Sequence, residues 1–174
     1  MLASLISAIA QAPVQSNHTI LRNVVVVGYW LSFAVTAIRA RPATEVFSNF
    51  ALAGCGSLLV MYVFGIFHKI NTDLLNPESS CALALWAEMP WPLHAIQGKA
   101  MDMLAIYGTF AVEGAIMLAL IFPRTRYVGL VCGIAFHLLL GLSNYAVYLA
   151  FTTLTISLHV LFLSPSQLDR INRS

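Results

Sequence analysis

Charged residues are scarce in this sequence: nine Lys+Arg and seven Asp+Glu make up only 9% of its 174 residues. An average soluble domain is about 25% charged. So few charges cannot cover the surface of an ordinary globular protein of this length. The composition therefore excludes a soluble enzyme, a nucleic-acid-binding protein and a disordered chain. The net charge of +2 is also too small to indicate a phosphate-binding surface.

Cysteine is rare as well, and its three positions form no motif. Cys55 and Cys132 lie in long apolar runs, and Cys81 lies alone between two such runs. A disulfide framework and a CxxC metal site are thereby excluded, and we expect no bound metal. No basic segment precedes the first apolar stretch, so we do not expect a secretory signal peptide.

What the sequence does contain is a series of long uncharged runs, with 59% hydrophobic residues overall. A helix needs about 20 largely apolar residues to cross a bilayer. The charges delimit four runs, the last of them long enough for two crossings, so we predict five membrane-spanning helices: about 23–39, 46–68, 102–123, 127–143 and 146–163. The polar pair Ser143-Asn144 predicts the turn between the last two. The expected fold is an all-α polytopic transmembrane bundle of about five spans, forming one domain over residues 1–174.

The basic residues predict how this bundle is oriented. With five spans, six arginines fall on one side of the membrane: Arg39, Arg41, Arg124, Arg126, Arg170 and Arg173. Arg22, Lys69 and Lys99 fall on the other side. Cytoplasmic loops are enriched in basic residues, so we expect the N-terminus outside and the C-terminus in the cytoplasm. The expected location is a bacterial cytoplasmic (inner) membrane.

Two segments outside the predicted spans are also apolar. Residues 1–12 are too short to cross a bilayer, and they fit either an interfacial helix or the end of a truncated span. In the outer loop 70–100, Asn76-Pro77-Glu78 has the pattern of a helix start. This helix is expected to run through Trp86 and to stop before Pro90, lying on the outer leaflet or dipping into it. It could serve as an interfacial cover without chemistry.

Ionisable residues inside the spans are candidates for function because they are costly in a bilayer. Glu113 lies near the centre of its span, and Asp102 precedes it by eleven residues, close to three helical turns or about 16 Å. Both carboxylates are therefore expected on one helix face. His137 lies at similar depth in the next span, and a Glu113–His137 contact would satisfy both groups. The alternative is a structural pair that only fixes the register of the helices.

Small and polar residues in the last two spans indicate close helix packing. Gly129, Gly133, His137 and Gly141 recur in steps of four, which lets another helix approach and keeps His137 away from lipid. Thr152, Thr155 and His159 share a face of the last span, where we expect a packing role.

Lys69 ends the second predicted span and follows His68. A lysine at a membrane boundary commonly acts as an anchor. Partial desolvation could instead let it act as a base. Spacing and composition leave both roles open.

The segment from Tyr62 to Pro77, YVFGIFHKINTDLLNP, resembles the signature of the horizontally transferred transmembrane domain family, which includes vitamin K-dependent gamma-carboxylase. Glu113, the Pro123–Arg126 turn and Phe136-His137-Leu138 are similar to later spans of that family. The resemblance covers roughly residues 15–165. The family usually has further N-terminal spans, and the carboxylase has a large extramembrane domain; this sequence contains neither.

The resemblance implies a chemistry for these residues. In the carboxylase the corresponding lysine deprotonates reduced vitamin K, so Lys69 would be the candidate base and His68 its neighbour. Glu113 and His137 would be pocket residues.

Two functions follow from these observations. The first is an accessory subunit of a larger membrane complex, packed against other membrane subunits and lipids and holding a quinone or lipid. The alternative is a membrane enzyme that uses Lys69 as a base on a quinol or another lipid-soluble substrate. A transporter is less well supported because the sequence has no evident inverted repeat.

Overall fold

The computed structural model describes residues 17–42, 44–70, 72–144 and 146–163, and these residues form helices joined by turns, without strands. Three helices are long and apolar enough to cross a membrane: Ile20–Ile38, Glu45–Lys69 and Lys99–Ile121. The predicted all-α class is therefore confirmed over this part of the chain, and the three helices fit an integral membrane protein. The alternatives for residues 1–12 lie outside the described residues.

The last two apolar helices are shorter than predicted. Helix α8 covers Arg126–Gly141 and helix α9 covers Ala146–Val160, 16 and 15 residues. At 1.5 Å per residue they are about 24 and 22 Å long, less than the roughly 30 Å of a hydrocarbon core. Helix α8 ends before the predicted residue 143 because residues 142–144 form the turn to α9, and α9 ends before the predicted residue 163 because a turn begins after Val160. By length and composition alone, three spans are therefore present where five were expected.

The chain divides into two compact units, Met1–Met61 and Tyr62–Ser174, which we call the N-terminal and C-terminal units. In the N-terminal unit, helix α2 (Asn17–Ile38) approaches the first part of helix α3 (Thr44–Lys69). A methyl group on Gly28 would lie 3.9 Å from the Phe50 ring. The Asn49 amide donates a hydrogen bond to the buried Thr36 hydroxyl at 3.1 Å, which joins the two helices through polar side chains.

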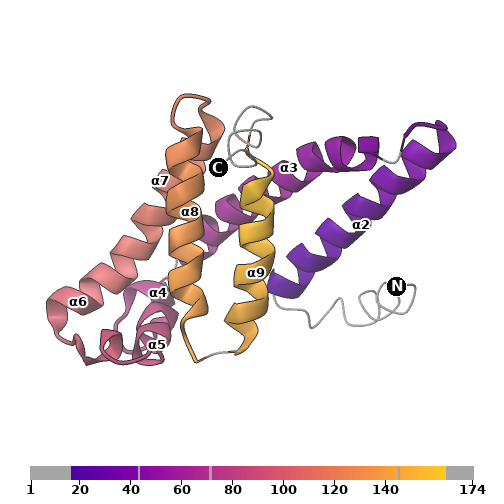
Figure 1. The fold of residues 1–174 in the computed structure, drawn as a ribbon. Coiled ribbons are helices and arrows are strands. Elements are labelled where there is room, and N and C mark those ends of the chain that lie inside the picture. Colours follow the sequence, from indigo (N-terminus) through magenta and orange to yellow (C-terminus); the bar gives the residue numbers. More distant parts are fainter. Residues whose placement is uncertain (1–16, 43, 71, 145, 164–174) are drawn as a thin grey trace. The chain divides into compact units, whose positions relative to one another are not determined.

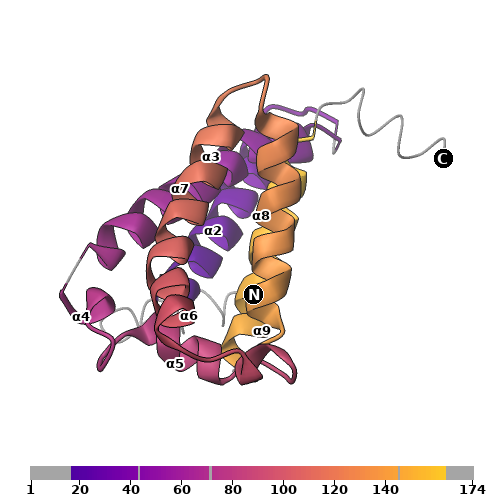
Figure 2. The same cartoon turned by 90° about the vertical axis from the view of Figure 1, so that its left-hand side faces the viewer.

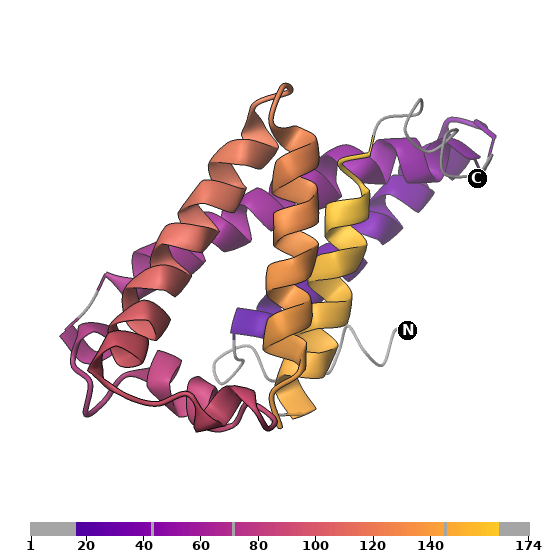
Figure 3. The same ribbon diagram turned by 60° about the vertical axis from the view of Figure 1, so that its left-hand side comes forward.

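The C-terminal unit contains the end of α3 and all later elements (Figure 1). These are α4 (Thr72–Leu75), α5 (Cys81–Ala87), η2 (Leu93–Ala95), α6 (Lys99–Met103), the π-helical turn η3 (Leu104–Gly108), α7 (Thr109–Ile121), α8 and α9. Helices α7, α8 and α9 lie side by side (Figures 1 and 2). The short elements α4 to α6 gather at the end opposite the α7–α8 turn (Figure 3). The turns predicted at Pro123–Arg126 and Ser143-Asn144 are both present.

Glycines allow α8 to lie close to the helices on both sides of it. A methyl group on Gly129 would come within 2.8 Å of the Leu120 backbone nitrogen in α7. One on Gly141 would come within 3.0 Å of the Thr152 side chain in α9. Contacts this short exclude a larger residue without movement of the neighbouring helix. The glycines therefore fix the three helices as one closely packed layer.

The loop between α3 and α6 differs from the prediction at its start. Asn76 does not begin a helix; its side chain accepts a hydrogen bond from the Glu78 N–H at 3.0 Å and closes a turn. Asparagine stabilises such turns as readily as it caps helices, so the prediction of a helix start at Asn76 was wrong. Helix α5 begins instead at Cys81 and ends at Ala87, before Pro90 as predicted. The Asn144 N–H donates to the Glu88 carbonyl at 3.0 Å and ties this loop to the α8–α9 turn.

Candidate functional site

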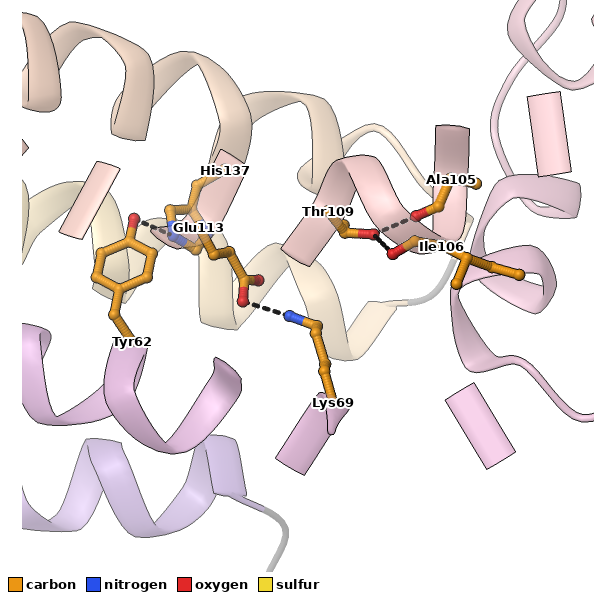
Figure 4. Close-up of polar contacts among 7 residues, drawn as sticks. All are labelled: Tyr62, Lys69, Ala105, Ile106, Thr109, Glu113 and His137. Carbon is orange, nitrogen blue, oxygen red and sulfur yellow. Dashed lines mark hydrogen bonds and ion pairs between the residues drawn. The ribbon is translucent and has the colours of Figure 1, made fainter. Parts of the chain in front are cut away.

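The end of α3 presents one face of functional side chains to the rest of the C-terminal unit. Tyr62, Gly65 and Lys69 are spaced at i, i+3 and i+7, so they lie on one side of the helix. Tyr62 is only 1% exposed, and Lys69 is the last residue of α3. This face brings a hydroxyl and an ammonium group into the space beside α7, α8 and α9 (Figure 4).

Lys69 forms an ion pair with Glu113 of α7: its Nζ donates a hydrogen bond to Glu113 Oε2. The two side chains are 21% and 11% exposed. Gly65 lies beside the carboxylate, since a methyl group there would be 3.4 Å from Oε2. Removal of one partner from such a buried pair costs about 3–5 kcal/mol because it strands the other charge. The expected Glu113–His137 contact is thus replaced by a Glu113–Lys69 pair.

The second cluster joins three helices through one hydroxyl group. Tyr62 Oη of α3 lies 3.1 Å from His137 Nε2 of α8 and 3.0 Å from His159 Nε2 of α9. The two histidines are 1% and 0% exposed. His159 Nδ1 lies 2.7 Å from the Thr155 carbonyl. His137, which was expected to contact Glu113, therefore has Tyr62 as its side-chain hydrogen-bond partner.

Side chains of helix α9 pack closely around this cluster. The predicted stripe of Thr152, Thr155 and His159 is buried. The Thr152 hydroxyl donates to the His137 carbonyl at 2.9 Å, and Gly133 leaves space for the His159 ring. A methyl group at Gly133 would come within 2.1 Å of His159 Nε2. The glycine spacing in α8 therefore positions the imidazole of His159 as well as the helix backbones.

Two candidates from the sequence lie outside these contacts. Asp102 of α6 is half-buried, and the π-helical turn η3 stands between it and Glu113. A π turn holds more residues than an α turn, so the argument that both carboxylates share a face fails. His68 is exposed, with its ring centroid 6.3 Å from Phe64 and 6.2 Å from Phe67. Its role as a neighbour of Lys69 stays a prediction.

Tyr62 is a candidate site residue that sequence reasoning missed. It begins the segment on which the family resemblance rests, but no role was assigned to it there. The signal that would have found it is its spacing: it precedes Lys69 by seven residues, two helical turns, and so shares the face of that lysine.

The arrangement can hold and move protons, and it offers no metal site. Across the described ranges, no group of three or more His, Cys, Asp or Glu side chains could hold a metal ion. The Lys69–Glu113 pair provides a charged donor and a charged acceptor. The Tyr62 cluster provides a chain of hydrogen bonds through one hydroxyl group and two imidazole rings. No protein-family model, curated protein or solved structure matches the chain, so its function is inferred from the geometry of these two clusters.

Proposed function

We propose that this protein is an integral membrane protein that binds a lipid-soluble molecule with an ionisable hydroxyl, such as a quinol, and takes the hydroxyl proton at Lys69 and Glu113. The buried ion pair between these residues carries the proposal. Charged side chains inside a membrane are costly, and they commonly mark a functional site. The resemblance of the segment around Lys69 to the gamma-carboxylase-like family points to the same class of substrate.

The base in this proposal is the pair and not Lys69 alone. An ammonium group that is paired with a carboxylate has no lone pair to offer. Whichever partner holds the shared proton, the pair as a whole can take up one more. It then consists of an ammonium group and a carboxylic acid, with a net charge of +1. That charge would stabilise the ligand anion, because opposite charges attract strongly where water is scarce.

We also propose that α8 and α9 cross the membrane, which gives five spans. Both are apolar, and α8 packs closely on the spanning helix that ends at Ile121. Residues flanking these short helices would complete each crossing. Basic residues then put the turns at Arg39–Arg41 and Arg124–Arg126 in the cytoplasm of a bacterial cell, with the N-terminus outside. Helix α5 would lie on the outer leaflet.

The test is to identify the molecule that the protein retains. Protein purified in mild detergent would be extracted with organic solvent, and the extract analysed by mass spectrometry. We expect a quinol or quinone in the wild-type extract and its loss in the double variant Lys69→Met/Glu113→Gln. The double variant removes both charges together, so it avoids a stranded charge. Lys99→Met, which changes the only other lysine, is the matched control and should retain the molecule.

The proposal fails if the double variant folds and still retains the same compound in the same amount. It also fails if the wild-type protein retains no hydroxyl-bearing or quinone-type compound and binds none of several added quinols.

A second candidate function, an accessory subunit of a larger membrane complex, is favoured by an aromatic cluster on α2. Tyr29, Trp30 and Phe33 are all exposed, and the Trp30 ring contacts each of the other two edge to face. Tyr29 and Trp30 lie at the middle of the Ile20–Ile38 span. Tyrosine and tryptophan normally lie at the membrane–water interfaces, so this depth favours contact with another protein over contact with acyl chains.

Native mass spectrometry of protein extracted from its own membrane tests this second candidate. A co-purifying subunit should be lost in Trp30→Leu and kept in Leu31→Ala, which changes a more exposed neighbour. A wild-type protein that runs free of any other chain would rule this candidate out.

A further inference from the structure

Helix α7 does not continue α6 in regular α-helical geometry, because the residues Leu104–Gly108 between them form the π-helical turn η3. A turn with i→i+5 hydrogen bonds accommodates one residue more than an α turn, and such turns are frequent at functional sites. This one lies inside the helix Lys99–Ile121, which is long enough to cross the membrane, and it ends shortly before Glu113. Its place in the chain therefore points to the Lys69–Glu113 pair.

The π turn frees a backbone acceptor, and the Thr109 hydroxyl satisfies it. In an α-helix each carbonyl accepts from the N–H four residues later, whereas in a π turn the N–H donates five residues back. An isolated π turn thus leaves one carbonyl without an amide, and in hydrocarbon no water takes its place. The Thr109 hydroxyl shares its proton between the Ala105 carbonyl, four residues back, and the Ile106 carbonyl at 3.3 Å (Figure 4).

Other hydroxyls bond to their own helix without this role. Ser57 and Thr153 each donate to the carbonyl four residues back, within α3 and α9. In a regular α-helix such a carbonyl already accepts from a backbone amide, so the hydroxyl only adds a second hydrogen bond. At Thr109 the hydroxyl replaces a hydrogen bond that the π geometry removes. Thr109 therefore stabilises the turn itself.

The turn in the backbone determines which way Glu113 faces. Thr109 and Glu113 are one helical turn apart on α7, and Glu113 shares the buried face of that helix with Ile116 and Leu120. If the same residues were wound entirely as an α-helix, the extra residue would rotate α7 by about 100° relative to α6. Helix α5 contacts η3 and holds the α6 side in place. The rotation would then take the carboxylate away from Lys69.

We propose that Thr109 is a positioning residue of the site: by satisfying the carbonyl that the π turn frees, its hydroxyl holds α7 in the rotation that points Glu113 at Lys69. This inference rests on the function proposed above and deepens it, because the proton acceptor in that function is the intact pair. Thr109 needs no contact with the ligand and acts only through the direction of the carboxylate. Without the hydroxyl, the α-helical register is favoured and the pair separates.

Solid-state NMR of the protein in lipid bilayers measures the pair directly. With nitrogen-15 in lysine side chains and carbon-13 in glutamate carboxyl groups, dipolar dephasing reports the distance from Lys69 Nζ to the Glu113 carboxyl carbon. The chain has one other lysine, so all samples carry Lys99→Met and give a single side-chain nitrogen signal. We expect strong dephasing with Thr109 present, its loss in Thr109→Val, and its return in Thr109→Ser, which restores the hydroxyl.

The amount of compound that the purified protein retains gives a second measurement. It should fall at least about 10-fold in Thr109→Val, the effect of losing one charge-assisted contact, and should recover in Thr109→Ser. Thr153→Val is the matched control, because it removes a hydroxyl with the same i−4 hydrogen bond from a regular helix, and it should change neither measurement. Thr109→Ala keeps the test open if Thr109→Val does not fold, since alanine favours the α-helical register most strongly.

The outcomes separate this inference from the function on which it rests. Undiminished dephasing in folded Thr109→Val or Thr109→Ala overturns the inference alone, and so does an equal loss of dephasing in Thr153→Val. If Thr109→Val loses the dephasing but retains as much compound as the protein with Thr109, the positioning role is upheld and the proposed function is overturned. Absence of dephasing with Thr109 present overturns both.

Discussion

Gly133 of α8 lies directly against the imidazole of His159 in α9, so closely that a methyl group at position 133 would come within 2.1 Å of Nε2. The same nitrogen accepts the hydrogen bond from Tyr62, because in the neutral ring the proton is on Nδ1, which donates to the Thr155 carbonyl. The position of the histidine thus depends on the absence of a side chain one helix away. This dependence can be measured.

Gly133→Ala should destabilise the protein by about 1–3 kcal/mol, the usual cost of an extra methyl group in a packed core. His159 would have to move and would lose its contact with Tyr62. The free energy of unfolding in detergent measures the effect. Gly56→Ala is the control, because a methyl group there meets no atom within 4 Å. Equal stability of the two variants would contradict the packing described.

Lys69→Met and Glu113→Gln should each cost about 3–5 kcal/mol, because each strands a buried charge. The double variant should cost clearly less than the sum of the two. A double-mutant cycle on the free energy of unfolding measures this coupling. Arg41 and Glu45, 4.0 Å apart and well exposed, provide a comparison pair whose coupling should be below about 1 kcal/mol. Additive single effects for Lys69 and Glu113 would mean that the pair does not form.

Tyr62→Phe should cost about 2–4 kcal/mol, because it removes the partner of two buried imidazole nitrogens. The proton on His137 would also lose the acceptor that holds it on Nε2. Thermal unfolding measures the first effect, and nitrogen-15 NMR of the two histidines measures the second. Tyr107→Phe, at an exposed position, should change neither. Unchanged histidine signals in Tyr62→Phe would speak against the cluster.

Thr152→Val tests the link between α8 and α9 at nearly constant volume. The Thr152 hydroxyl donates to the His137 carbonyl, and its loss should cost about 1 kcal/mol. Thr153→Val changes a neighbouring hydroxyl that bonds only within its own helix and is exposed, so it should be close to neutral. The comparison requires only unfolding curves of both variants. A larger cost at Thr153 than at Thr152 would be incompatible with this contact.

Apolar runs bounded by charges were enough to predict an all-helical chain with helices long enough to cross a membrane, because hydrocarbon length dictates element length. The turns at Pro123–Arg126 and Ser143-Asn144 were also predictable, since prolines, charges and adjacent polar residues interrupt those runs. The start of α5 at Cys81 was not predictable in this way. Asn76 can close a turn or cap a helix with the same side-chain oxygen, and only the fold decides between them.

For the candidate site, the sequence indicates which side chains are costly in a membrane but not how they pair. Glu113 and His137 were expected to contact each other, but their partners, Lys69 and Tyr62, come from a third helix far away in the chain. Depth in the membrane gave the expected Glu113–His137 contact. The actual contacts depend on the rotation of each helix about its own axis, which determines where its side chains point. A π-helical turn changes this rotation, and regular helical spacing does not predict that change.

That turn has a consequence for how the chain tolerates changes in length. Deleting one residue from Leu104–Gly108 would convert the π-helical turn into an ordinary α-helical one, and Glu113 could keep its orientation. The same deletion within α7 would swing every side chain on one side of the cut by about 100° relative to the other. Loss of a codon should therefore be tolerated in the five residues of the turn and disruptive a few positions later.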